Sequence, residues 1–302
     1  AAGASAGDKA AIAAKMREDD YYGKLKTVSV ARELAELIHL HNVKLDEDAV
    51  GSQKSLLYWE MSSVSELKFQ KLARTAATGV AKHTGQQLLR VYPKGTRIDS
   101  SNYSPMTAWN HGAQVVALNY QTHAMPLWLN DARFRDNGGC GWLLKPAFMM
   151  RPNYNPALHA GMPARTLQVH ILSGWKLPKI GKEVIDPFVE LRIYGHDVDK
   201  RKSILTRHVE DNGYNPVWDQ KFSIPLVHPE SAIFVLLVKD HDRFPNPDDF
   251  VGQCAVPVPC LRSGYRSVPL KDANGRRIPD ASVLCRFTFE DARGGAVASS
   301  GA

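Results

Sequence analysis

The sequence of 302 residues has few cysteines and no long apolar run. The cysteines show no CxxC spacing, so they favour neither a disulfide framework nor a zinc site and are typical of a reducing cytosol. No segment approaches the ~18 apolar residues of a transmembrane helix, and residues 1–14 lack the hydrophobic stretch of a signal peptide. We therefore expect a cytoplasmic protein that is recruited to membranes peripherally. The four cysteines are Cys140, Cys254, Cys260 and Cys285.

The charge of the chain is moderately basic, with a formal net charge of +7. Residues 1–164 carry 19 Lys and Arg side chains against 14 Asp and Glu side chains, so the excess lies in the first half. It suits an anionic membrane surface, where each nearby cation contributes roughly 1 kcal/mol, although a solvated basic face is an equally good interpretation. No nucleic-acid motif accompanies the charge, so we expect no nucleic-acid partner.

Residues 28–150 alternate between strand-like and helix-like segments, after an alanine-rich tail or linker at residues 1–27. Such alternation predicts βαβ units with a parallel sheet. Four strands make an α/β half of a TIM (β/α)8 barrel, whose edges invite pairing with another chain. We also expect Ser100–Tyr103 to build a turn and cap the helix that Pro105 opens. The predicted strands are residues 34–44, 88–92, 114–120 and 141–145, and the predicted helices are residues 64–76 and 105–110.

Residues 151–164 are rich in Pro, Asn and Gly, which predicts a linker. Short alternating strands separated by turn residues then fill residues 165–292, a pattern typical of an antiparallel β-sandwich. Residues 293–302 are expected to form a disordered tail. The eight predicted strands are residues 166–173, 188–194, 203–207, 220–225, 232–239, 250–256, 264–269 and 282–290.

Three residues of the first part are suited to bind a phosphate and a sugar-like ring. Arg90 offers a planar five-donor fork that fits a phosphate bidentately, and Ser63, expected on the loop after the first strand, donates a hydroxyl. Tyr92 follows Arg90 on the same strand face, where its ring can pack against a sugar-like ring. A surface ion pair and a rim-packing aromatic are the structural alternatives. Lys145 suits phosphate and solvent equally, so it is left out of the site.

Residues 90–110, 114–122 and 137–146 resemble the Y half of the barrel in eukaryotic, delta-like phosphoinositide-specific phospholipases C. The motif Ser63-Val64-Ser65-Glu66 and the pair Arg90-x-Tyr92 match this family's contacts to the inositol phosphate. The resemblance implies substrate binding by Ser63, Arg90 and Tyr92. It also implies hydrolysis of phosphatidylinositol 4,5-bisphosphate to diacylglycerol and inositol trisphosphate, in lipid degradation and signal transduction.

The X half of that barrel is missing from the sequence as it stands. In the family this half supplies two histidines for acid/base work and the side chains that hold a calcium ion. The pair His41-Asn42 lacks the Thr-Tyr that follows in the family and is expected to be a packing or rim histidine. We therefore expect no catalytic residue here, an inactive isolated chain, and an X-type half-barrel supplied in cis or in trans. The alternative is a non-catalytic module that binds calcium and phospholipid.

Acidic residues gather on three loops of the predicted sandwich, as a hard Ca²⁺ ion with six to eight oxygen ligands requires. The segments Asp186-Pro187, Asn215–Trp218 and Asp249–Gly252 resemble a C2 domain of the phospholipase C topology. Turn formation is the structural alternative for any single loop aspartate. The basic segment Lys200–Lys202 suits anionic lipid or solvent equally. The resemblance implies calcium ligation by the Val184 carbonyl, Asp186, Asp211, Asp240 and Asp242, with Asp249 as a further candidate.

Overall fold

The computed structural model describes residues 37–47, 50–51, 59–158, 164–181, 184–200, 203–242 and 247–291. The segment Asn42–Ala302 forms one compact unit. The expected tails at residues 1–27 and 293–302 lie outside the described residues, and the domain limits stay predictions. No helix in the described part of the chain is both long and apolar enough to cross a membrane.

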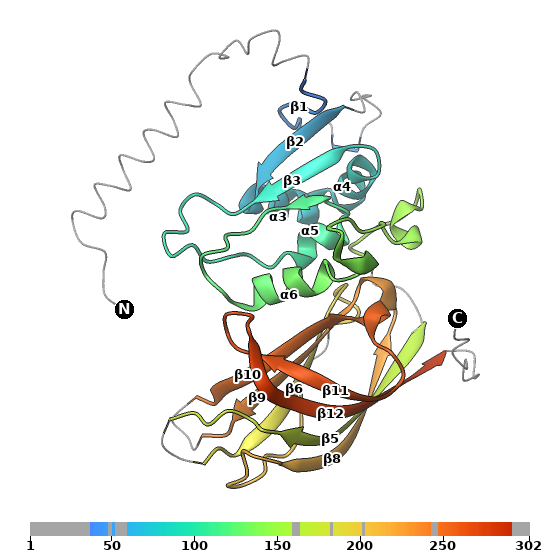
Figure 1. Ribbon diagram of the computed structural model, residues 1–302. Coiled ribbons are helices and arrows are strands. Elements are labelled where there is room, and N and C mark those ends of the chain that lie inside the picture. Colours follow the sequence, from blue (N-terminus) through green and yellow to red (C-terminus); the bar gives the residue numbers. More distant parts are fainter. Residues whose placement is uncertain are drawn as a thin grey trace, which may run out of the picture. The chain divides into compact units, whose positions relative to one another are not determined.

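The first part contains a four-stranded sheet with strand order β1-β2-β3-β4. β2 and β3 run side by side in the same direction, and β4 continues the parallel arrangement (Figure 1). Helices follow the strands, as in half of a TIM barrel. The strands are β1 (His41–Asn42), β2 (Glu60–Ser65), β3 (Leu88–Tyr92) and β4 (Val115–Val116), and the helices are α3 (Glu66–Thr75), α4 (Ala77–Thr84), α5 (Met106–Asn110) and α6 (Met125–Arg133).

Sequence patterns located this sheet only in part. β2 was not predicted, because its serine-rich segment has low β-propensity; its pairing with β3 supplies the hydrogen bonds that stabilise it. The strand expected at residues 141–145 is wrong. Gly138, Gly139 and Gly141 have φ angles of 68°, 72° and 83°, so the chain turns repeatedly just before and at the start of that segment. Among the described residues, the strand expected at 34–44 is reduced to β1, and the strand expected at 114–120 to β4.

α3 shows how local sequence fixes the sheet. Ser65 caps the helix by accepting a hydrogen bond from the Lys68 backbone N–H at 3.4 Å. Phe69 and Leu72, spaced three residues apart, are buried on one face of the helix. They pack with Val64 and with strand residues of β3 in one core cluster. The opposite face of the β2–β3 pair is consequently left for polar side chains.

The second part is the predicted C2-type β-sandwich, and all eight predicted strands are confirmed. Two four-stranded layers, β7-β6-β9-β10 and β11-β12-β5-β8, meet at the single residue pair Gln253–Lys271. Leu167, Phe234 and Phe287 are among the side chains of the shared core. The strands are β5 (Arg165–Trp175), β6 (Pro187–Tyr194), β7 (Ile204–Leu205), β8 (Val217–Leu226), β9 (Ile233–Asp240), β10 (Asp249–Pro257), β11 (Gly264–Lys271) and β12 (Arg277–Asp291). Short 3-10 helices are Asn137–Gly139, Ala147–Met150, Pro229–Ser231 and Val258–Cys260.

α6 packs directly on β9 and β10, so the two parts share an apolar cluster. Leu129 and Ala132 of α6 are buried against Val235 of β9. The Trp128 ring stacks on Phe250 with 5.5 Å between the ring centroids. The indole N–H of Trp128 also donates to the Ala273 carbonyl at 2.9 Å. This apolar cluster joins the half-barrel to the sandwich.

We predict that Leu129→Ala lowers the free energy of unfolding by about 2–5 kcal/mol, because Leu129 is 1% exposed and its removal leaves a cavity. Urea denaturation followed by circular dichroism measures the change. Leu67→Ala is the matched control, because Leu67 is 55% exposed on α3 and its loss should cost under about 0.5 kcal/mol. Equal effects of the two substitutions would contradict the prediction.

Candidate functional site

The strand register brings the three predicted substrate-binding residues onto one face of the sheet. Ser63 lies directly opposite Arg90 in the parallel β2–β3 pair, and Tyr92 lies two residues beyond Arg90. Their neighbours Val64 and Val91 are buried on the opposite face, whereas these three side chains are only partly buried. Neighbouring strands are about 4.8 Å apart, so Ser63 and Arg90 can contact one ligand. The expectation that Ser63 lies on a loop is wrong, because it lies within β2.

Arg90 is the free cation of this face. Its guanidinium carbon lies 5.0 Å from the centroid of the Tyr92 ring, which orients the fork by a cation–π contact. No carboxylate of the described residues forms an ion pair with it. One face of the Tyr92 ring is therefore occupied by Arg90, and the guanidinium keeps its donors for an anion.

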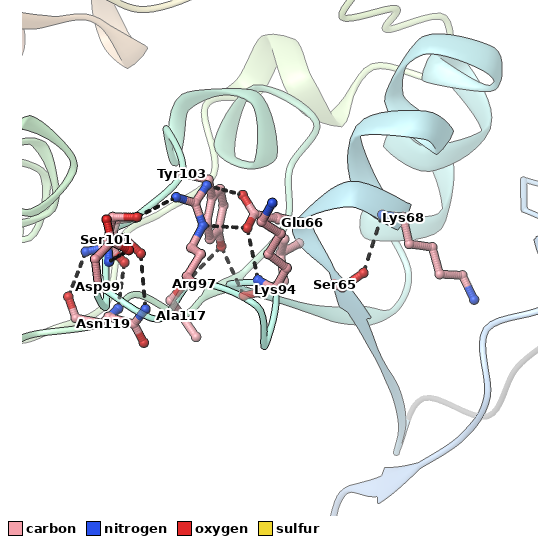
Figure 2. Close-up of polar contacts among 12 residues, drawn as sticks. Ser65, Glu66, Lys68, Lys94, Arg97, Asp99, Ser101, Tyr103, Ala117 and Asn119 are labelled. Carbon is pink, nitrogen blue, oxygen red and sulfur yellow. Dashed lines mark hydrogen bonds and ion pairs between the residues drawn. The ribbon is translucent and has the colours of Figure 1, made fainter. Parts of the chain in front are cut away.

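A buried ion pair between Glu66 and Arg97 holds the loop that follows β3 (Figure 2). Glu66, at the first turn of α3, is 2% exposed. Arg97 Nε and Nη2 each donate to one of its carboxylate oxygens at 2.7 Å, and the Lys94 backbone N–H donates at 2.9 Å. Arg97 Nη1 also donates to Ser101 Oγ at 2.9 Å. The sequence analysis missed this pair, although the acidic residue in the first turn of the predicted helix was a signal for it.

The pKa of Glu66 is set by opposing effects. Burial favours the neutral acid, but the hydrogen bonds and positive charge of Arg97, together with the Lys94 backbone N–H, lower the pKa below its ordinary value. The same pair raises the pKa of Arg97. Both groups are therefore charged at neutral pH, and each one stabilises the other.

Further hydrogen bonds connect the loops after β3 and β4 (Figure 2). The Tyr103 hydroxyl lies 3.1 Å from the carbonyl oxygens of both Val91 and Ala117. Burial raises the pKa of this phenol. Asn102 and Asn119 exchange two hydrogen bonds of 2.7 Å. These hydrogen bonds hold the two loops together. The prediction that Ser100–Tyr103 cap the following helix is wrong, because α5 begins after Pro105 without a side-chain cap.

Lys145 lies away from this face. Its Nζ donates to the Thr84 carbonyl at 2.7 Å, and burial lowers the pKa of the amine.

Five of the predicted calcium ligands lie in the loops or at the adjoining strand ends at one end of the sandwich, and hydrogen bonds link them. Asp240 Oδ1 accepts from the Asp186 backbone N–H, and Asp186 Oδ1 accepts from the Asp211 backbone N–H, both at 2.7 Å. The Asp249 backbone N–H donates to Asp242 Oδ2 at 3.3 Å.

The electrostatics of this acidic cluster fit a cation. Burial, followed by the charges of Asp242, Asp186 and Asp249, raises the pKa of Asp240. The donors are all oxygens, as Ca²⁺ prefers. Val184, two residues before Asp186, is 54% exposed. In the described part of the chain, however, no three His, Cys, Asp or Glu side chains lie close enough together to hold a metal ion.

Comparison with known proteins gives two family matches. Residues 34–148 match the family described as "Phosphatidylinositol-specific phospholipase C, Y domain", and residues 165–270 match the C2 domain. The human "1-phosphatidylinositol 4,5-bisphosphate phosphodiesterase delta-1" is 36% identical over 273 residues, which is 87% of this chain and 36% of the relative. A delta-4 enzyme of Xenopus laevis is 38% identical over 80% of this chain and 33% of the relative. The chain therefore spans about a third of the length of these curated relatives.

Two solved structures agree with this comparison and with the fold. The crystal structure of S. officinalis PLC21 matches with a TM-score of 0.76 and 31% identity, over 91% of this chain and 35% of that protein. The crystal structure of L. pealei PLC21 matches with a TM-score of 0.77 and 30% identity, over 99% and 38%. The α/β half-barrel followed by a C2 sandwich is confirmed.

We predict that Glu66→Gln removes part of the acid sensitivity of folding. A lowered folded-state pKa means that the charged pair contributes its full stabilisation above the ordinary glutamate pKa, and loses it as the pH falls through the lowered value. Urea unfolding at several pH values, from about 7 to about 3, measures the slope. Glu47→Gln is the control, because the Glu47–Lys68 pair is exposed (38% and 30%). Equal slopes in the two variants would contradict the role of Glu66.

Proposed function

The chain carries the Y domain and the C2 domain of the phosphoinositide-specific phospholipase C family, and we propose that it forms part of an enzyme that hydrolyses phosphatidylinositol 4,5-bisphosphate to diacylglycerol and inositol trisphosphate. Within that enzyme this chain supplies head-group binding and calcium-dependent membrane docking. The observation that carries the proposal is the unpaired Arg90, held opposite Ser63 at the carboxyl end of parallel strands.

Arg90 binds a phosphate of the head group through its planar fork, and the Ser63 hydroxyl donates to the same anion. Tyr92 supports the guanidinium and borders the inositol ring. These contacts are made alike to the bound substrate and to the transition state, so they position the lipid and contribute to KM. None of the three side chains is suited to moving protons at neutral pH, so the acid and base come from elsewhere.

An X-type half-barrel, in the same longer chain or in a separate one, completes the site. β4 is an edge strand of the sheet, and edge strands present unpaired backbone groups that favour addition of a further strand. A groove of about 740 Å³ borders β4 and is lined by Val115, Val116 and Trp142. Trp142 is 79% exposed and Leu144, also in the groove, is 95% exposed. Two large apolar side chains with this exposure in one groove support the burial of the groove by a partner.

Calcium ions dock the C2 domain on anionic lipid. The ion would be held by the Val184 carbonyl, Asp186, Asp211, Asp240 and Asp242, with Asp249 completing the set. Burial, followed by repulsion from the neighbouring carboxylates, raises the pKa of Asp240, and a bound Ca²⁺ would supply the positive charge that offsets this repulsion and attracts lipid phosphate. The hydrogen bonds from the Asp186 backbone N–H to Asp240 Oδ1 and from the Asp211 backbone N–H to Asp186 Oδ1 hold these loops close together beforehand.

The decisive experiment measures inositol trisphosphate release by the purified chain with and without an added X-type half-barrel. We expect no release by the chain alone and release from the mixture. Turnover by the chain alone would contradict the assignment of proton transfer to the X half. No turnover by the mixture, with calcium-dependent vesicle binding retained, would favour the non-catalytic module.

In that mixture Arg90→Lys should lower kcat/KM by about 10- to 150-fold, mainly through KM, because a bidentate charge-assisted contact of about 1.5–3 kcal/mol is lost. Arg74→Lys is the matched control, since Arg74 is exposed in the last turn of α3. An unchanged KM in Arg90→Lys would contradict head-group binding by this residue.

For docking, we predict that Asp240→Asn combined with Asp242→Asn abolishes the calcium-dependent increase in binding to phosphatidylserine vesicles. Each substitution replaces a charged ligand by a weaker neutral one. Sedimentation with calcium and with a chelator measures the increase. Glu230→Gln with Asp280→Asn removes the same charge elsewhere on the sandwich and should leave the increase intact. A retained increase in the first variant would overturn the ligand set.

A further inference from the structure

A row of polar side chains crosses the exposed face of the β11-β12-β5-β8 layer. In the register of these strands Lys221 lies opposite His170, His170 opposite Arg286, and Arg286 opposite Tyr265. Successive strands lie about 4.8 Å apart, so the four residues form one line across the layer. Lys221, Arg286 and Tyr265 are exposed, and the His170 side chain is 17% exposed. The row lies in mid-strand, separate from the loops of the acidic cluster.

Two cations of this row have no acidic partner. Among the described residues, no carboxylate forms an ion pair with Lys221 or Arg286. The guanidinium carbon of Arg286 lies 5.6 Å from the centroid of the Tyr265 ring, which holds the fork above the sheet. His170 between them contacts Asp219 at 2.6 Å. By contrast, Lys176 and Arg165 of the same sandwich are paired with Asp280 and Asp291.

Lys221 of β8 and Arg286 of β12 lie on either side of β5, so their charges are not offset by a paired carboxylate among the described residues. Asp219, which contacts His170, has a φ of 48°, in the left-handed region that non-glycine residues rarely adopt. Strain of this kind persists where the rest of the fold enforces it, and it is a reason to look for a function.

We propose that Lys221, His170 and Arg286 bind the phosphates of anionic phospholipids, as a second membrane contact that does not require calcium. The cations complement phosphate charge, and Arg286 can donate bidentately. Apolar side chains beside the row fit a lipid interface. Tyr265 is 60% exposed, and Leu284, two residues before Arg286 on the same strand face, is 38% exposed. An open sheet face suits a layer of head groups rather than an enclosed soluble ligand.

The test is sedimentation of the full chain with phosphatidylcholine vesicles that contain phosphatidylserine, in a chelator of calcium and at low salt. Lys221→Ala with Arg286→Ala should weaken binding about 25-fold, since each cation near an acidic surface contributes roughly fivefold. Arg262→Ala with Arg276→Ala is the matched control. It removes the same charge from exposed positions outside the row and should change binding less than about twofold.

Asp219→Asn gives a prediction of opposite sign. Loss of its charge leaves the row more positive, and asparagine tolerates the left-handed backbone, so lipid binding should rise by about fivefold. A purely structural role of Asp219 would not raise affinity. Circular dichroism and the thermal midpoint check that each variant is folded.

Three results would overturn the proposal. The first is equal loss in the row variant and the control, which would show a bulk charge effect. The second is no binding of the parent chain in the chelator, which would leave the face to another partner. The third is full release from vesicles by soluble inositol hexakisphosphate at stoichiometric amounts, which would make a soluble phosphate the occupant.

Discussion

The carboxylate of Glu66 is buried at the start of α3, and a buried charge is stable only when it is paired and hydrogen-bonded. Arg97 meets that requirement by donating to both carboxylate oxygens of Glu66. The pair thereby fixes the loop between β3 and α5. Arg97 is bound in this pair. Arg90, on the face of β3 that also carries Tyr92, has no carboxylate partner among the described residues. The two arginines therefore differ in environment: Arg97 is held in an ion pair with a buried carboxylate, whereas Arg90 forms no ion pair with a carboxylate of the described residues.

The same distinction between satisfied and unsatisfied charge runs through the sandwich. Lys176 and Arg165 have carboxylate partners, whereas Lys221 and Arg286 have none among the described residues. The acidic cluster around Asp240 shows the converse, because its carboxylates face one another and raise the Asp240 pKa. Unbalanced charge costs stability, and the proposed sites for anionic and cationic ligands are the three places where it is concentrated.

α6 packs on β9 and β10 and so holds the first part of the chain against the sandwich. Trp128 stacks on Phe250, which directly follows the candidate ligand Asp249. Buried apolar cores are close-packed and resist deformation, so the contact restricts how the sandwich moves against the first part of the chain.

The sequence alone determined the two-part organisation, the eight strands of the sandwich, the pairing of Arg90 with Tyr92 on one strand face, and the acidic loops. Strong alternation and turn residues report these features locally. Only the tertiary structure decided that Ser63 lies in β2, that the 141–145 segment is not a strand, that Arg97 belongs to Glu66, and that Lys221, His170 and Arg286 form one row. The absence of a strand at 141–145 follows from glycine residues with positive φ angles. The other features depend on strand pairing between distant segments or on burial of a charge, and neither is encoded in the spacing of neighbouring residues.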